Sequence, residues 1–128
     1  MFENLDIFRM SSAMASHAAR RHTVTAQNMA NSDTPGYKAQ RLASFGDAVE
    51  ASMPGTGMRA TRGGHLHGQR MDLGRATPEA DARDPSPDGN TVSVEREMLE
   101  AVSAKREHDR ALTIYRSAMK ILHSTLSR

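Results

Sequence analysis

The stretch Asn28-Met-Ala-Asn-Ser-Asp-Thr-Pro-Gly-Tyr-Lys38 decides the fold, because it ends a long helical pattern and turns the chain. Pro35 disfavours helical geometry at the residue before it, and Gly36 supplies a position that accepts positive φ. Residues 34–37 therefore fit a type II turn, with proline second and glycine third. The sequence predicts that the first helix stops near Asn31 and that an extended segment begins at Tyr37.

The segment before this turn predicts a helix over residues 5–30. Its small and apolar residues recur at alternating steps of three and four, the spacing of a coiled-coil seam. The predicted seam consists of Leu5, Phe8, Ser12, Ala15, Ala19, His22, Ala26 and Met29. Because most of these side chains are small, they contribute little hydrophobic free energy, and the helix needs a partner.

A second periodic segment reaches the C-terminus. Asp88-Gly89-Asn90 signals a turn, and Ser93 can cap a helix that opens at about Val94. Its predicted seam consists of Met98, Ala101, Lys105, His108, Leu112, Tyr115, Met119, Leu122 and Leu126. A second stripe widens the apolar face with Ala111, Ile114, Ala118 and Ile121. At about 1.5 Å per residue the two helices have similar lengths, which favours an antiparallel pair.

The middle of the chain carries neither period and holds eight of the nine glycines. The sequence allows short strands at 57–62 and 70–73, and 76–87 looks flexible because few apolar groups offset the entropy of ordering. The predicted fold class is mainly α, with long terminal helices pairing as a coiled-coil-like hairpin around an irregular Gly/Pro-rich middle. The predicted parts are residues 1–37, 38–90 and 91–128: N-terminal helix and turn, partly flexible middle, and C-terminal helix.

Composition argues against several function classes. The absence of cysteine excludes a disulfide framework and a thiolate metal site. No run approaches the roughly 18 apolar residues of a membrane-spanning helix, and the N-terminus lacks the pattern of a cleavable secretory signal. The net charge is only +2, and acidic residues interrupt the basic ones, which argues against a nucleic-acid partner.

The sequence contains no catalytic constellation, and we expect no enzyme activity, cofactor, bound metal or small-molecule substrate. His65 and His67 lie close together, but no third ligand has suitable spacing. The other histidines lack His-x-x-x-His spacing and are typical of packing or surface positions: His17, His22, His108 and His123.

Asn28 and Asn31 lie three residues apart on one face of the first helix, beside the turn. They are either solvated amides at a capped helix end, or groups that bond to main chain or to a neighbouring chain. A buried asparagine of the second kind fixes axial register. Spacing alone leaves both interpretations open.

Two motifs of the chain, at residues 28–38 and 88–92, carry a family resemblance. Asn28-Met-Ala-Asn31 followed by Asp33-Thr-Pro-Gly-Tyr-Lys38 resembles the N-terminal signature of bacterial flagellar axial proteins, the rod and hook family. Asp88-Gly-Asn-Thr-Val92 and the charged helix after it are similar to the FlgB family of proximal rod proteins. The matching motif residues are Asn28, Asn31, Thr34, Pro35, Gly36, Tyr37, Asp88, Gly89 and Asn90.

The resemblance implies a non-catalytic structural subunit of the proximal rod of the flagellar basal body, which transmits torque to the hook. Such a subunit passes through the flagellar export apparatus without a cleavable signal peptide and assembles in the periplasmic space. Implied partners are further copies, other proximal rod proteins and the adaptor next to the export gate. The alternative from another class is a small basic helical adaptor or nucleic-acid-binding protein.

The resemblance also implies which residues act. The motif residues would form the corner between helix and middle, and the two helices would pair and pack against neighbouring subunits. The subunit-packing residues are then Leu5, Phe8, Ala15, Ala19, Ala26, Met29, Met98, Leu112, Tyr115, Met119, Leu122 and Leu126.

Overall fold

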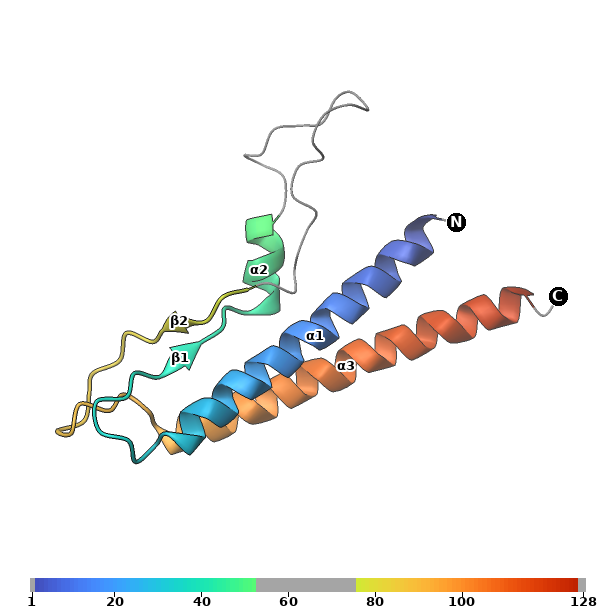
Figure 1. The fold of residues 1–128 in the computed structure, drawn as a ribbon. Coiled ribbons are helices and arrows are strands. Elements are labelled where there is room, and N and C mark those ends of the chain that lie inside the picture. The colour runs from blue at the N-terminus through green and yellow to red at the C-terminus, as the bar shows by residue number, and fades with distance from the viewer. Residues whose placement is uncertain (1, 53–75, 127–128) are drawn as a thin grey trace, which may run out of the picture.

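The structure is a computed structural model that describes residues 2–52 and 76–126. Within these residues the chain forms α1 (Phe2–Ala30), β1 (Gln40–Arg41), α2 (Phe45–Ser52), β2 (Glu79–Ala80) and α3 (Val94–Leu126). Figure 1 shows α1 and α3 running antiparallel, with both chain ends at one end of the pair and the connecting turns at the other. The predicted mainly α fold with paired terminal helices is confirmed. None of the helices in the described part has the length and hydropathy needed to cross a membrane.

Small side chains make the contact between α1 and α3. They recur at every seventh position in buried sites, at Ser11, Ala18 and Thr25 in α1 and at Ala104 and Ala111 in α3. A period of seven is that of a left-handed coiled coil, and small residues let two helix backbones approach closely. Towards the chain ends, the rings of Phe8 and Tyr115 meet edge to face with centroids 5.2 Å apart.

Over the half of the hairpin nearer the corner, the predicted seams are displaced from this contact by one residue in both helices, whereas the predicted seam residues Phe8 and Tyr115 do meet towards the chain ends. In α1 the side chains that face α3 are Ser11, Met14, Ala18, Arg21, Thr25 and Asn28, each one residue before a predicted position. In the first half of α3 they are Glu97, Glu100, Ala104, Glu107 and Ala111. The prediction was wrong there because it followed apolar residues, whereas the chain buries charged and amide side chains as bonded pairs.

The displacement places the predicted residues on one side of the hairpin. One residue corresponds to about 100° around a helix, and in an antiparallel pair equal displacements turn both sets of side chains to the same side. His17 and Val24, on the other side of α1, are buried near Phe45 and β1. We call the uncovered side the open face; it contains Ala15, Ala19, Ala26, Met29, Met98, Leu112 and Met119.

Exposure differs among the predicted packing residues. Ala19, Ala26, Met98, Tyr115, Met119 and Leu126 are exposed, and Phe8, Ala15, Met29, Leu112 and Leu122 are half-buried. The side chain of Leu5 lies outside the described residues. Of the second predicted stripe, Ala111 is buried and Ala118 is half-buried, whereas Ile114 and Ile121 are exposed, so only the alanines of this stripe mark the observed contact.

The middle of the chain contains a helix that the sequence patterns did not predict. In α2, Ser44 acts as the N-cap, and its hydroxyl oxygen accepts the main-chain N–H of Asp47 at 3.2 Å. The ring of Phe45 packs against His17 at a centroid distance of 5.6 Å, which holds α2 on α1. We missed α2 because it is only eight residues long, has a glycine at its second position and lies in a stretch that we took as irregular throughout.

The segment 76–87, which we expected to be flexible, makes specific contacts with the rest of the chain. Its β2 pairs antiparallel with β1 through Gln40 opposite Ala80. The main-chain N–H of Asp81 then donates to the carbonyl of Ala39 at 2.8 Å. The contacts of this segment are hydrogen bonds and ion pairs rather than buried apolar groups. The strands predicted at 57–62 and 70–73, and His65 and His67, lie outside the described residues.

Candidate functional site: the corner of the hairpin

The first helix ends in the turn that its sequence predicts. The N–H of Tyr37 donates to the carbonyl of Thr34 at 3.2 Å, which closes the four-residue turn over Pro35 and Gly36. Gly36 has φ 71°, the left-handed value that a type II turn requires at its third position. The prediction of this turn is confirmed.

A second turn from the other end of the chain packs directly on the first. The N–H of Gly89 donates to the carbonyl of Ser86 at 2.7 Å, and Gly89 has φ 81°. The N–H of Gly36 donates to the carbonyl of Asp88 at 3.0 Å. A Cβ on Gly89 would lie 3.4 Å from the Cα of Gly36, so the two turns touch through their glycines. The turn predicted at residues 88–90 is confirmed.

Asn90, which lies shortly before α3 in the sequence, bonds to the turn that follows the C-terminal end of α1. Its side-chain Nδ2 donates to the carbonyls of Asn31 at 3.0 Å, Ser32 at 2.7 Å and Thr34 at 3.0 Å. Its Oδ1 accepts the N–H of Val92 at 2.8 Å. These three carbonyls lie just past Ala30, where α1 ends, and a buried amide, 2% exposed, supplies their hydrogen-bond donor.

Asn28 joins three elements through one amide. Its Oδ1 accepts the N–H of Gln40 at 3.0 Å, and its Nδ2 donates to the carbonyl of Gln40 at 2.7 Å. The side chain thus pairs with β1 much as a neighbouring strand would. The Nδ2 also donates to Oε2 of Glu97 in α3 at 3.1 Å, and the hydroxyl of Tyr37 donates to Oδ1 at 3.4 Å. Asn28 is 1% exposed, which excludes a solvated amide.

Asn31 behaves differently from Asn28. Its Nδ2 donates to the carbonyl of Gln27 at 2.8 Å, one turn back, and its Oδ1 accepts the hydroxyl of Thr34 at 3.3 Å. These bonds are local and partly exposed. Of the two interpretations left open by the sequence, Asn28 follows the bonded one within its own chain, and Asn31 is closer to a capping amide.

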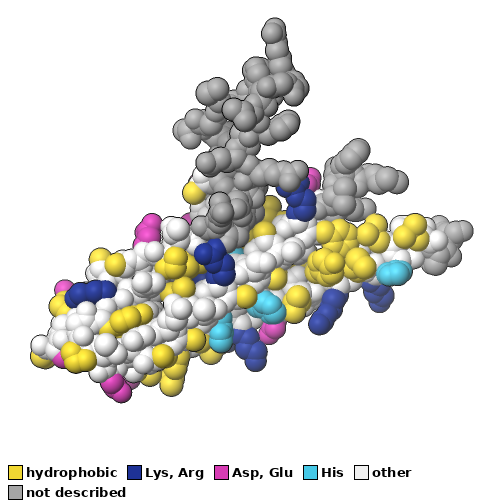
Figure 2. Space-filling view, in the orientation of Figure 1, with side chains coloured by type: hydrophobic (Ala, Val, Ile, Leu, Met, Phe, Trp, Pro, Cys, Tyr) yellow, Lys and Arg dark blue, Asp and Glu magenta, His cyan; other side chains and the backbone are white. Residues whose placement is uncertain are grey.

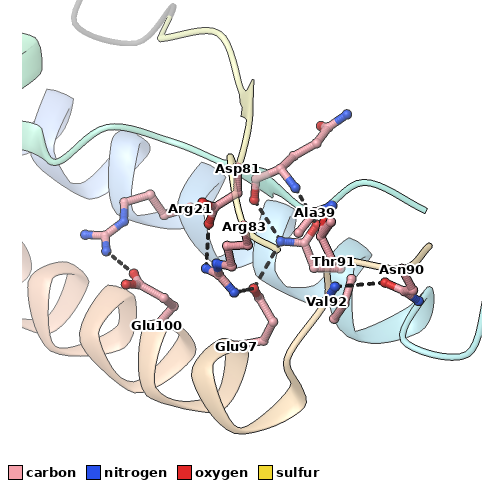
Figure 3. Close-up of polar contacts among 11 residues, drawn as sticks. Arg21, Ala39, Asp81, Arg83, Asn90, Thr91, Val92, Glu97 and Glu100 are labelled. Atoms are coloured by element: carbon pink, nitrogen blue, oxygen red, sulfur yellow. Dashed lines mark hydrogen bonds and ion pairs between the residues drawn. The ribbon is translucent and has the colours of Figure 1, made fainter. Parts of the chain in front are cut away.

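Thr91 closes the corner behind Asn90. Its N–H donates to the carbonyl of Tyr37 at 3.1 Å, and its hydroxyl oxygen accepts the N–H of Ala39 at 2.8 Å. Figure 3 shows the bond between Thr91 and Ala39 beside the ion pairs of Arg83. The exit from the first turn and the entry to α3 are therefore joined side by side.

A charged network continues from the corner along the hairpin. The Arg83 guanidinium lies 2.6 Å from Asp81 and 3.6 Å from Glu97, whose carboxylate is 3% exposed (Figure 3). Arg21 of α1 reaches two carboxylates of α3, Glu100 at 2.5 Å and Glu107 at 2.7 Å. Buried carboxylates need such partners, because an unpaired buried charge is strongly destabilising.

The electrostatics of Arg21 agree with this geometry. Burial alone would lower the pKa of its guanidinium, but the hydrogen bonds from Glu107 and Glu100 outweigh it and raise the pKa. Arg21 therefore stays charged and holds α1 and α3 together at two points of α3.

Sequence reasoning found the motif residues but missed their partners. The structure brings both motifs into one corner, whereas Arg21, Asp81, Arg83, Thr91 and Glu97 were not among the predicted site residues. Glu97 had only the signal of an acidic residue in the first turn of a helix, which normally marks a solvated side chain. Arg83 lies in the segment expected to be flexible and gave no signal.

Curated relatives place this fold among known proteins, although no family profile matches the chain. It is 30% identical over 110 residues to the flagellar basal body rod protein FlgB of Aeromonas hydrophila, covering 84% of this chain and 83% of the relative. It is 28% identical over 139 residues to FlgB of Salmonella typhimurium, covering 98% and 97%. It is 25% identical over 127 residues to FlgB of Agrobacterium fabrum, covering 97% and 95%.

The hairpin of terminal helices, its motif-built corner and these relatives define a class, the axial proteins of the bacterial flagellum. Within that class the relatives named above are all basal body rod proteins of one kind. The chain belongs to the FlgB family.

Proposed function

We propose that this chain, a structural subunit of the flagellar basal-body rod, stands in the proximal rod and packs there through its terminal helices. The observation that supports this most directly is the open face. Its alanines and methionines lie on one side of the hairpin, where Ala19, Ala26, Met98 and Met119 are exposed and Ala15 and Met29 are half-buried. A helix pair that leaves an apolar side uncovered needs a further partner, which a tubular array of neighbours would supply.

The corner has a mechanical role in this proposal. Asn28, Asn90 and Thr91 bond both turns to the ends of α1 and α3. Beyond the corner, Arg21 ties α1 to α3, and Arg83 ties the segment after β2 to Glu97 of α3. Because these bonds lie between elements far apart in the sequence, they fix how the two helices meet. A subunit stiffened in this way would pass torsion to its neighbours and from them to the hook.

The partners follow from the same proposal. They are other copies of the chain, other proximal rod proteins and the adaptor beside the export gate, met in the periplasmic space after passage through the export apparatus. The subunit acts by packing and not as an enzyme. Neither the fold nor the relatives favour the alternative of a small basic adaptor or a nucleic-acid-binding protein.

Electron cryotomography of cell envelopes tests the rod assignment. Deletion of the gene should remove the rod and hook and leave the export base in place, and the wild-type gene should restore them. Intact rods in the deletion strain would refute the assignment.

Variants of the open face test the packing. Ala26→Glu and Leu112→Asp each place a carboxylate among apolar neighbours in the assembled rod. We expect Ala26→Glu, at an exposed position, to leave the isolated chain folded but to prevent rod restoration. The control Ser16→Glu changes an exposed residue off the open face and should restore rods. Full restoration by both open-face variants would refute this packing.

A further inference from the structure

A small pocket lies where β1 and the segment after β2 meet the helix pair, on the side away from the open face. Four segments line it, with Arg21 and Thr25 of α1, Leu42 after β1, Arg83 after β2, and Glu97 and Glu100 of α3. Figure 2 shows hydrophobic side chains gathered over the terminal half of the helix pair. The pocket lies in the other half, nearer the corner, and most of its lining is polar or charged.

Two polar groups of this lining have no hydrogen-bond partner among the described residues. One is Nη1 of Arg83, which is buried. Oε1 of Glu97 lies 3.6 Å from it, beyond the length of a direct hydrogen bond (Figure 3). The other is the hydroxyl of Thr25, a residue that is 6% exposed. Because a buried polar group without a partner costs free energy, both groups call for a partner that these residues do not supply.

The size of the pocket and the chemistry of its lining indicate which partner fits. The pocket has a volume of about 20 Å³. A bound water molecule needs roughly 10–15 Å³ and two to four polar partners, so the space suits one water and no larger molecule. Arg83 and Thr25 provide hydrogen-bond donors, and the carboxylates of Glu97 and Glu100 provide acceptors. Water both donates and accepts, which matches such a mixed set.

The charges around the pocket favour a neutral occupant over an ion. The lining carries three cations, Arg21, Arg41 and Arg83, and two carboxylates, Glu97 and Glu100. Asp81 also pairs with Arg83 at 2.6 Å, and Glu107 pairs with Arg21 at 2.7 Å. An anion would therefore face the two lining carboxylates, and a cation would face the guanidinium groups.

We propose that this pocket binds one water molecule, which accepts hydrogen bonds from Nη1 of Arg83 and the Thr25 hydroxyl and donates to the carboxylates of Glu97 and Glu100. The water joins the segment after β2 to both helices through a hydrogen-bonded bridge. This inference goes beyond the proposed function and does not rest on it, because it concerns how one chain holds its own segments together.

Oxygen-17 relaxation dispersion tests the site. It detects water molecules held for longer than the protein takes to tumble, and proton exchange from hydroxyl or guanidinium groups does not affect it. Thr25→Leu places a larger, apolar side chain in the pocket, and we expect the dispersion of the wild type to exceed that of this variant by about one bound water. Thr23→Leu, at an exposed position of the same helix, is the control and should retain the wild-type dispersion.

Two outcomes of this experiment would overturn the proposal. One is equal dispersion in the wild type and in Thr25→Leu, with circular dichroism showing that the variant is folded. The other is broadening of the chloride-35 resonance by the wild type and not by Thr25→Leu, which would assign the pocket to an anion.

Thr25→Val gives a second measurement that does not require the pocket to be filled. Valine has nearly the shape of threonine but no hydroxyl, so the substitution removes one hydrogen bond of the bound water. We expect the melting temperature to fall by about 3–5 °C. Thr23→Val is the control, because that exposed hydroxyl bonds only to the Ala19 carbonyl of its own helix, and it should change the melting temperature little. Without the water, the Thr25 hydroxyl is an unpaired buried group, so a melting temperature for Thr25→Val equal to or above that of the wild type would contradict the site.

Discussion

The side-chain amide of Asn28 donates to the Glu97 carboxylate at 3.1 Å, and both side chains are almost fully buried. This bond joins the end of α1 to the start of α3, and the same amide also pairs with Gln40 of β1. One residue of the N-terminal motif therefore fixes the three elements that meet at the corner.

Asn28→Asp should destabilise the chain more than Asn28→Ala does. It places a second carboxylate beside Glu97, and we expect the free energy of unfolding to fall by about 3–5 kcal/mol. Asn28→Ala leaves buried groups unpaired and should cost about 1–3 kcal/mol. Urea denaturation followed by circular dichroism measures both. Adding Glu97→Gln to Asn28→Asp should recover part of the loss, and no recovery would contradict the direct contact.

Gly36 should resist substitution for conformational reasons alone. No atom lies within 4 Å of a Cβ built there, so its φ of 71° is the sole obstacle. We expect Gly36→Val to cost about 1–3 kcal/mol and Gly36→Asn less, because asparagine tolerates the left-handed region. Gly46→Ala in α2 is the matched control and should be neutral or stabilising. Thermal unfolding compares them, and equal melting temperatures for the valine and asparagine variants would argue against the turn.

Arg21 should contribute more to stability than the neighbouring Arg20. Arg21→Ala removes two hydrogen-bonded ion pairs to α3 and should cost about 1.5–3 kcal/mol. Arg20→Ala removes no ion pair within the described part of the chain and should change stability by less than about 0.5 kcal/mol. Paired urea titrations give the difference. Equal effects of the two substitutions would mean that the ion pairs do not hold the helices.

The sequence predicts the helices and turns of this fold better than it predicts which residues of α1 and α3 face each other. The periodic ends and the Thr34–Tyr37 turn reveal the helices and the corner because these signals are local. The seams were displaced because Ser11 and Ser12, and likewise Ala18 and Ala19, offer equal small residues to either side of the helix. The side chains that decide between them, above all Asn28 and Glu97, are polar and paired over a long sequence distance, so no hydrophobic pattern marks them.

His17 should make the stability of the chain depend on pH. Its side chain is buried, and burial, followed by the charges of Arg21 and Arg20, lowers the pKa of the imidazole, against an opposing effect of Glu107. Protonation is therefore favoured in the unfolded chain, so stability is full above about pH 6.5 and falls as the pH drops below it.

His17→Leu should remove this part of the pH dependence. Melting temperatures at pH 7.5 and 5.5 should differ less in that variant than in the wild type. His22→Leu changes an exposed histidine of the same helix and should retain the wild-type difference. An unchanged difference in His17→Leu would show that other groups set the pH response.

Ala18 and Ala19 test the register of the hairpin most directly, because they are adjacent and identical but lie on different sides. Ala18 is 1% exposed, so Ala18→Leu overfills the contact with α3 and should cost about 1–3 kcal/mol. Ala19→Leu adds the same atoms on the open face and should change the stability of the isolated chain by less than about 0.5 kcal/mol. Ala19→Leu should instead impair rod restoration, because a neighbouring subunit packs there in the proposed rod. If Ala19→Leu were destabilised and Ala18→Leu were not, α1 and α3 would meet through the seam predicted from the sequence, and the register described above would be wrong.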